Sequence, residues 1–311
     1  DFAMKLIPPL EGVTSASDVK YESRELKIEL ISEDTGKKIY KSICNLKPVQ
    51  SLFSMEIDPG EFFGYVTLQI SFKFEGSLLL SWCSLMPLDS IKGWRKDVVE
   101  KLIEAKVPVL RFPGGCYTTF FNWREWAVLR NERRAMPSFF WGGLDENDTG
   151  IDEFLDLCEA SGAKPQICIN MMTSNAFEAA SLVEYCNGAD DSPMGKLRVF
   201  NGIKRNMKVR FWEMDNEAAR KWSPLQYAER VVEFARKMRD ADPDIFIMME
   251  YYTFGVENLK PMLQIAGKFI DAVIHRNTDS KLIMFSNEML NEYNKENGTK
   301  IVFVNTEWLS E

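Results

Sequence analysis

The chain has 311 residues, of which 45% are hydrophobic and 27% charged, the composition of a globular protein long enough to bury a sizeable core. Its net charge of −8 and isoelectric point near 5.1 argue against a nucleic-acid partner, whereas a neutral sugar is compatible with this balance. No apolar run approaches the roughly 18–20 residues that a membrane span needs.

The N-terminal part of the chain carries strand patterns. The segment "YVTLQISFKF" at residues 65–74 alternates apolar and polar side chains, which is typical of a half-buried antiparallel strand. "LKIELI" and "LFSMEI" are shorter segments of the same kind. We therefore expect a β-sandwich-like module, similar to a carbohydrate-binding module, over residues 1–86. The chain begins with Asp1 rather than Met, which suggests processing, trimming or incomplete coverage.

From about residue 95 the pattern changes to alternating helices and apolar strands. The predicted strands lie at residues 107–112, 165–170, 209–214, 244–252, 271–276 and 300–308. Near-continuous apolar strands separated by helices predict a parallel sheet covered by helices, either a doubly wound sheet or a (β/α)8 TIM-type barrel. No glycine-rich phosphate-binding motif follows any strand, which weakens a nucleotide-binding interpretation.

Polar and aromatic residues follow these strands where the strands end. In parallel α/β folds that edge of the sheet is where binding and catalytic sites are built. Glu217 and Glu307 are 90 residues apart, about three units of a barrel with roughly 31 residues per unit. If 107–112 is the second strand, the two glutamates follow the fourth and seventh strands and face one mouth. From "DNE" alone, however, Glu217 could equally be a helix cap on a surface loop.

Two facing carboxylates about 5–5.5 Å apart would equip a retaining glycoside hydrolase. The single histidine, His275, excludes a multi-histidine metal site, and none of the six cysteines forms a C-x-x-C motif. We therefore expect no metal and no cofactor, with the acid–base chemistry carried mainly by carboxylates.

Several longer stretches occur together and in one order: "VLRFPGGCYTTFFNWRE", "EAASLVEYCNG", "VRFWEMDNE" and "VFVNTEW". On these stretches, residues 84–308 resemble the α-L-arabinofuranosidases of glycoside hydrolase family 51, which belongs to a large clan of (β/α)8 retaining glycosidases. The resemblance implies that residues 87–311 form strands two to seven of the barrel. It also implies removal of terminal arabinofuranosyl residues from an arabinose-containing glycan, with a slight preference for an extracellular location.

The resemblance also implies roles for individual residues. Glu217 matches the general acid/base and Glu307 the nucleophile. Asn216 matches the amide that binds the sugar 2-hydroxyl, and Arg111 the arginine that keeps a carboxylate charged. The other residues that it implies for substrate binding are Cys116, Trp123, Asn170, His275 and Trp308.

Departures from the family pattern lie on the catalytic face. Asp215 stands where many members have glycine, and Asn277 where a tyrosine is expected. These changes leave an alternative, a catalytically inactive relative that serves as a structural or carbohydrate-binding subunit of a larger assembly.

The first and eighth barrel strands have no counterpart in the sequence. The first is not visible before residue 20, and the eighth should follow Glu307, four residues before the last residue. An open sheet would then expose the edges of the strands at 107–112 and 300–308, and exposed edges invite pairing. We expect another polypeptide, or further sequence of the same protein, to fill the gap. The alternative is that "LLLSWCSLM" folds back as a substitute strand.

Overall fold

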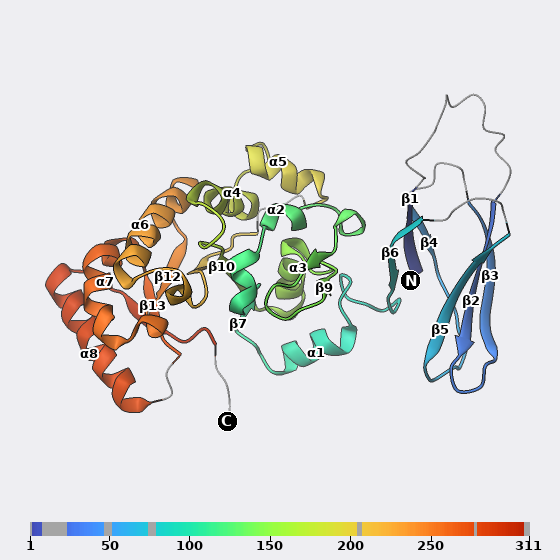
Figure 1. The fold of residues 1–311 in the computed structure, drawn as a ribbon, viewed down its shortest axis with the longest axis horizontal. Coiled ribbons are helices and arrows are strands. Elements are labelled where there is room, and N and C mark those ends of the chain that lie inside the picture. Colours follow the sequence, from blue (N-terminus) through green and yellow to red (C-terminus); the bar gives the residue numbers. More distant parts are fainter. Residues whose placement is uncertain are drawn as a thin grey trace. The chain divides into compact units, whose positions relative to one another are not determined.

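The computed structural model divides the chain into two compact units, Asp1–Lys96 and Asp97–Glu311 (Figure 1). The division falls ten residues beyond the boundary predicted at residue 86. The residues that the structure describes are 2–7, 24–46, 52–73, 79–203, 207–276 and 279–307.

The N-terminal unit contains two three-stranded antiparallel sheets. One has the order β4 (Leu52–Met55), β1 (Phe2–Ile7), β6 (Leu79–Leu85), and the other the order β3 (Lys38–Leu46), β2 (Arg24–Ser32), β5 (Val66–Phe72). Leu26 and Ile28 of β2 are fully buried, and Phe53 and Met55 of β4 pack against them. Because these pairs come from different sheets, the two sheets share one core, as in a β-sandwich.

The segment proposed as a substitute barrel strand lies in this unit. It forms β6, which pairs antiparallel with β1, so that Phe2 lies opposite Leu85. The alternative that it joins the barrel sheet is therefore wrong.

The second unit is built on a six-stranded parallel sheet. Its strands are β7 (Val109–Phe112), β10 (Lys164–Ile169), β11 (Phe211–Met214), β12 (Phe246–Glu250), β13 (Ala272–Ile274) and β14 (Val302–Val304). Each strand pairs with the next one along the chain. This order is that of a (β/α)8 barrel, whereas a doubly wound sheet reverses direction at a switch point.

The sheet has open edges at β7 and β14. Among the described residues no strand pairing joins these two edges. The expected six-stranded, incomplete barrel is thus confirmed. Glu217 follows its third strand, β11, and Glu307 follows its sixth, β14. That these are strands four and seven of a complete barrel stays a prediction.

Helices cover the outside of this curved sheet (Figure 1). The α-helices are α1 (Lys96–Glu104), α2 (Trp123–Trp126), α3 (Ile151–Ser161), α4 (Ala176–Asn187), α5 (Pro193–Phe200), α6 (Pro224–Ala241), α7 (Leu259–Ala266) and α8 (Ser280–Asn297). The 3-10 segments are η1 (Gly115–Phe120), η2 (Arg130–Glu132), η3 (Ala218–Arg220), η4 (Tyr252–Phe254), η5 (Val256–Asn258) and η6 (Gly267–Phe269). A short hairpin joins β8 (Met136–Pro137) and β9 (Leu144–Asp145).

Helix α6 shows why these segments are helical. Ser223 caps its first turn in a capping box with Gln226, and Pro224 occupies the first helical position. Its buried residues recur at helical spacing and face the sheet: Tyr227, Ala228, Val231, Phe234, Ala235 and Met238.

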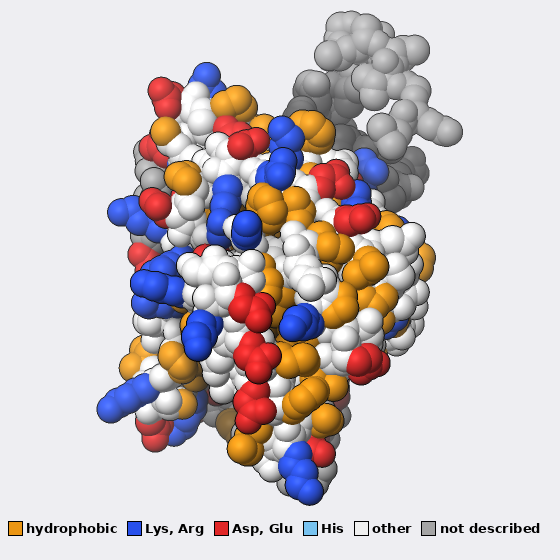
Figure 2. Space-filling model, turned by 90° about the vertical axis from the view of Figure 1, so that its left-hand side faces the viewer, with side chains coloured by type: hydrophobic (Ala, Val, Ile, Leu, Met, Phe, Trp, Pro, Cys, Tyr) orange, Lys and Arg blue, Asp and Glu red, His pale blue; other side chains and the backbone are white. Residues whose placement is uncertain are grey.

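The surface over α8 is mixed in character. Leu282, Met284 and Phe285 of this helix are exposed. Figure 2 shows hydrophobic side chains between acidic and basic ones on this side of the molecule. None of the helices within the described ranges is both long enough and apolar enough to cross a membrane.

Candidate active site

The loop after β11 begins with a residue in an unusual conformation. Asp215 has φ 64°, in the left-handed region that favours glycine, although aspartate can adopt it. Its fully buried carboxylate accepts hydrogen bonds from the N–H groups of Met171 at 2.6 Å, Met172 at 3.1 Å and Asn216 at 2.7 Å. These bonds offset the strain, so the departure from glycine at this position is accommodated. Burial raises the pKa of Asp215 to about 6, while the three N–H groups oppose that rise.

Two arginines link Asn216 to Glu307. The buried Oδ1 of Asn216 accepts hydrogen bonds from Arg111 Nη2 at 3.0 Å and Arg276 Nη2 at 2.6 Å. The Nη1 atoms of the same arginines reach Glu307 Oε2, at 3.6 Å from Arg111 and in closer contact from Arg276. Arg111 comes from β7 and Arg276 follows β13, so side chains from several strand ends converge at one edge of the sheet.

A further carboxylate, Glu213 of β11, lies beneath this cluster. It is fully buried, and its closest partner is Arg111, through Nε at 2.6 Å and Nη2 at 2.8 Å. Further donors surround it: Gln166 at 2.7 Å, the thiol of Cys168 at 3.2 Å, Thr306 at 3.2 Å and Arg276 at 3.5 Å. The sequence prediction missed both Glu213 and Arg276. A charged residue inside the apolar strand "FWEM" was the available signal.

Glu217 directly follows Asn216 in the sequence. Like Asp215, it has a left-handed backbone conformation, with φ 53° and ψ 51°. Its carboxylate contacts the guanidinium of Arg220 and lies 3.7 Å from the thiol of Cys116. Both Glu217 and Glu307 are about one-third to two-fifths exposed, at 35% and 40%, as residues that meet a substrate should be. Their predicted separation of about 5–5.5 Å remains a prediction.

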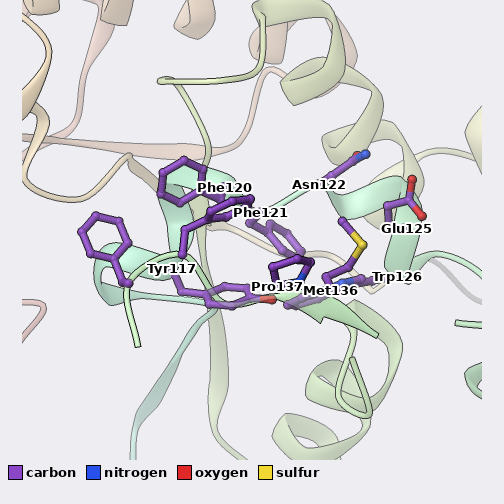
Figure 3. Close-up of a pocket in the computed structure, with 10 residues that line it drawn as sticks. Tyr117, Phe120, Phe121, Asn122, Glu125, Trp126, Met136 and Pro137 are labelled. Carbon is purple, nitrogen blue, oxygen red and sulfur yellow. The ribbon is translucent and has the colours of Figure 1, made fainter. Parts of the chain in front are cut away.

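Aromatic side chains adjoin the Glu217 side of the site. Arg220 lies over the ring of Phe140 at 4.9 Å. Phe140 and Phe139 in turn pack against Phe120, with ring centroids 5.6 and 5.0 Å away. Figure 3 shows the small pocket that Phe120, Tyr117 and Met136 help to line. Its volume of about 40 Å³ is close to that of one water, so the pocket is too small to enclose a sugar ring.

Two predicted substrate-binding residues are buried in the protein interior. Trp123 is 4% exposed, donates its indole N–H to the Glu178 carbonyl and packs against Tyr185. Because α2 turns this face into the hydrophobic core, the structure gives no support for its predicted place in the pocket wall, which stays a prediction. The side-chain amide of Asn170 bonds to backbone groups of neighbouring loops. It donates to the Phe121 carbonyl at 3.1 Å and accepts from the Thr173 N–H at 3.0 Å.

His275 remains at the strand edge. Its backbone N–H donates to the Val304 carbonyl, and its ring packs against Phe303. Trp308 and Asn277 lie outside the described residues. Within the described part of the chain, no cluster of three or more His, Cys, Asp or Glu side chains is placed to hold a metal ion.

Comparison with known proteins identifies the family. A family model described as the alpha-L-arabinofuranosidase 1 domain matches residues 101–296, more than half of the chain. The chain belongs to this family. Alpha-L-arabinofuranosidase C of Emericella nidulans is 37% identical over 184 residues, which cover 54% of this chain and 36% of that protein. The intracellular exo-alpha-L-arabinofuranosidase of Bacteroides ovatus is 35% identical over 164 residues, covering 52% of this chain and 32% of that protein.

Solved arabinofuranosidases share the fold. The enzyme from Thermotoga maritima, in complex with arabinose, superposes with a TM-score of 0.64 at 26% identity, covering 73% of this chain and 52% of that one. A family 51 enzyme from Bifidobacterium longum gives a TM-score of 0.66 at 23% identity, covering 72% and 51%. This arabinofuranosidase-family chain therefore spans about half the length of those structures, and the matched segment about a third of the curated relatives.

Proposed function

We propose that the chain carries the catalytic face of a retaining arabinofuranosidase acting on arabinose-containing glycans. The observation that carries this proposal is the pair of arginines, Arg111 and Arg276, that join Asn216 to Glu307. They link the loop of the candidate acid/base to the candidate nucleophile across three strand positions. Family membership and the curated relatives named as arabinofuranosidases support the same activity.

The chemistry follows from two carboxylates with different partners. Glu307 attacks the anomeric carbon while Glu217 donates a proton to the departing oxygen, which gives a covalent glycosyl-enzyme and a free alcohol. Glu217, now deprotonated, then takes a proton from a water that attacks the same carbon and releases arabinose. Arg111 and Arg276 hold Glu307 in place for the first step, and the family resemblance assigns the sugar 2-hydroxyl to Asn216.

Hydrolysis of aryl α-L-arabinofuranosides tests this proposal. We expect the wild-type chain to release the aryl alcohol and Glu307→Gln to abolish turnover. Glu217→Ala should lose least with good leaving groups, because these need little protonation. Glu178→Gln is the matched control, since Glu178 forms a half-exposed pair with Arg124 away from the cluster and should retain activity.

Three outcomes would count against the proposal. No hydrolysis by the wild type would favour the inactive relative. Turnover by Glu307→Gln would remove its role as nucleophile. An equal loss with all leaving groups in Glu217→Ala would remove its role as acid.

We also infer that two further strands complete the barrel, supplied by another polypeptide or by further sequence of the same protein. The edge strands β7 and β14 support this inference, because no sheet partner covers their outer edges among the described residues. Val302 of β14 is 47% exposed, and α1 exposes Val98 and Ile103. Exposed apolar edges favour association.

Light scattering after size-exclusion chromatography tests for such association. We expect the isolated chain to self-associate, and Val302→Lys to reduce this by placing a charge on the edge. A wild-type chain that stays monomeric at all concentrations would argue against an edge that requires a partner.

A further inference from the structure

Glu250 is a buried carboxylate that the mechanism above does not use. It is the last residue of β12, at the same edge of the sheet as the candidate site, and it is fully buried. Its Oε1 accepts a short hydrogen bond from the backbone N–H of Ala218, the residue that directly follows Glu217. A carboxylate from one strand end therefore holds the peptide next to the candidate acid/base on the neighbouring strand.

The held peptide follows a strained residue. A non-glycine residue in the left-handed conformation, as Glu217 is, costs about 1–2 kcal/mol and persists only where its surroundings fix it. Ala218 opens the single-turn segment η3, and the first N–H groups of a helical turn find no partner inside it. Glu250 supplies that partner, so it fixes the peptide plane that sets the direction of the Glu217 side chain.

A second connection joins the same two strand ends. The hydroxyl of Tyr227 donates to the Met214 carbonyl at 2.5 Å and accepts from the Glu250 N–H at 3.4 Å. Met214 is the last residue of β11, directly before the Asp215 turn. The ends of β11 and β12 are thus tied by a side chain as well as by the sheet.

Glu250 also interacts with the nucleophile side of the site. Its carboxylate is attracted to Arg276, which lies over the Tyr252 ring at 4.5 Å. Arg276 binds Asn216 and Glu307, as described above. Burial raises the pKa of Glu250 to about 7, whereas the Ala218 N–H, Tyr252 and Arg276 lower it.

We propose that Glu250 is a positioning residue for the acid/base: it fixes the orientation of Glu217 through the Ala218 amide. The kinetic part of this inference rests on the proposed function, which assigns Glu217 as the acid. The structural part does not, because the hydrogen bond to Ala218 can be measured without turnover.

Two variants of the full chain separate the hydrogen bond from the charge. Glu250→Gln keeps an oxygen that can accept the Ala218 N–H, whereas Glu250→Met has similar length and no acceptor. We expect the Ala218 amide to exchange slowly with deuterium in the wild type and in Glu250→Gln. In Glu250→Met it should exchange about 10-fold faster or more, because the N–H loses the carboxylate that accepts it.

Kinetics then test positioning. With aryl arabinofuranosides, Glu250→Met should lower kcat by about 10-fold or more for poor leaving groups, and by no more than about 3-fold for good ones, with little change in KM. Glu250→Gln should retain activity near the wild-type level. Asp152→Leu is the control. It removes another carboxylate, that of Asp152 on α3, which accepts a hydrogen bond from the Tyr185 hydroxyl on α4, and it should not alter the dependence on leaving group.

Unchanged protection of Ala218 in Glu250→Met would overturn the inference, as would an equal loss of kcat with every leaving group. If Glu250→Met does not fold, Tyr227→Phe removes the hydroxyl that joins the same strand ends. It should then show the same leaving-group dependence in weaker form, and its absence would likewise refute the inference. A wild-type chain without hydrolase activity would refute the proposed function alone, because the exchange measurement would still decide the role of Glu250.

Discussion

Replacing Glu213 by Gln tests whether the site is organised around this buried charge. The side chain is fully buried and accepts two hydrogen bonds from Arg111, with Arg276 close by. The side chains of the two arginines are only 14% and 12% exposed. Glutamine has nearly the same shape, but it removes the negative charge and places an NH2 group where one oxygen accepted donors.

The expected loss of stability is large. Removing one partner of a buried ion pair costs about 3–5 kcal/mol, because the remaining charge stays buried without compensation. Glu307 and Asn216 still contact both arginines, so we expect the lower end of that range, about 3 kcal/mol. With an m-value of about 2 kcal/mol per molar urea, the unfolding midpoint should fall by about 1.5 M.

Urea unfolding followed by tryptophan fluorescence measures this loss. Trp212 precedes Glu213 in β11 and is fully buried, so it reports on the unit that contains the site. The matched control is Glu178→Gln, whose half-exposed pair with Arg124 should contribute at most about 1 kcal/mol. If Glu213→Gln changed the free energy of unfolding by no more than this control, the buried charge would not organise the site.

Three further predictions follow from other residues. The pKa of Glu250 is raised from 4.5 to about 7, so its contribution to stability is present at low pH and is lost as the pH rises through 7. If the free energy of unfolding is measured between pH 5 and 8, Glu250→Gln should remove this fall, which amounts to at most about 3 kcal/mol. Asp215→Ala should be less stable than Asp215→Gly by about 1 kcal/mol in thermal unfolding, since only glycine adopts φ 64° without strain; equal stabilities would contradict this. If the proposed function holds, Phe139→Ala should lower kcat/KM on an arabinose-containing polysaccharide by about 5-fold without affecting small aryl substrates, because this 70% exposed ring packs against Phe120 on the Glu217 side of the candidate site; equal effects on both would refute it.

The fold was predictable because its signals are local and periodic. Each apolar strand is followed by a helix with a cap and an apolar stripe, as Ser223, Pro224 and the buried face of α6 show. The 90-residue spacing of Glu217 and Glu307 then placed them three strands apart, which the strand order confirms.

The interior of the site was less predictable because it depends on contacts distant in sequence. Glu213 and Arg111 are 102 residues apart, and no periodic pattern pairs them. For Trp123 the difficulty is different. The motif match implied a role in substrate binding, but motif matching does not show that α2 turns this residue into the core. Asp215 was recognised as a departure from glycine, but its hydrogen bonds to the Met171 and Met172 amides could be found only in three dimensions.

The contact between Arg111 and Glu307 has a consequence for assembly. Arg111 is on β7 and Glu307 follows β14, so this ion pair spans the two outermost strands of the sheet. The two side chains thereby connect edges that no strand pairing joins among the described residues, and they do so with charges that belong to the candidate site. Substituting Glu307 would therefore remove a contact between the two edges of the sheet as well as the candidate nucleophile.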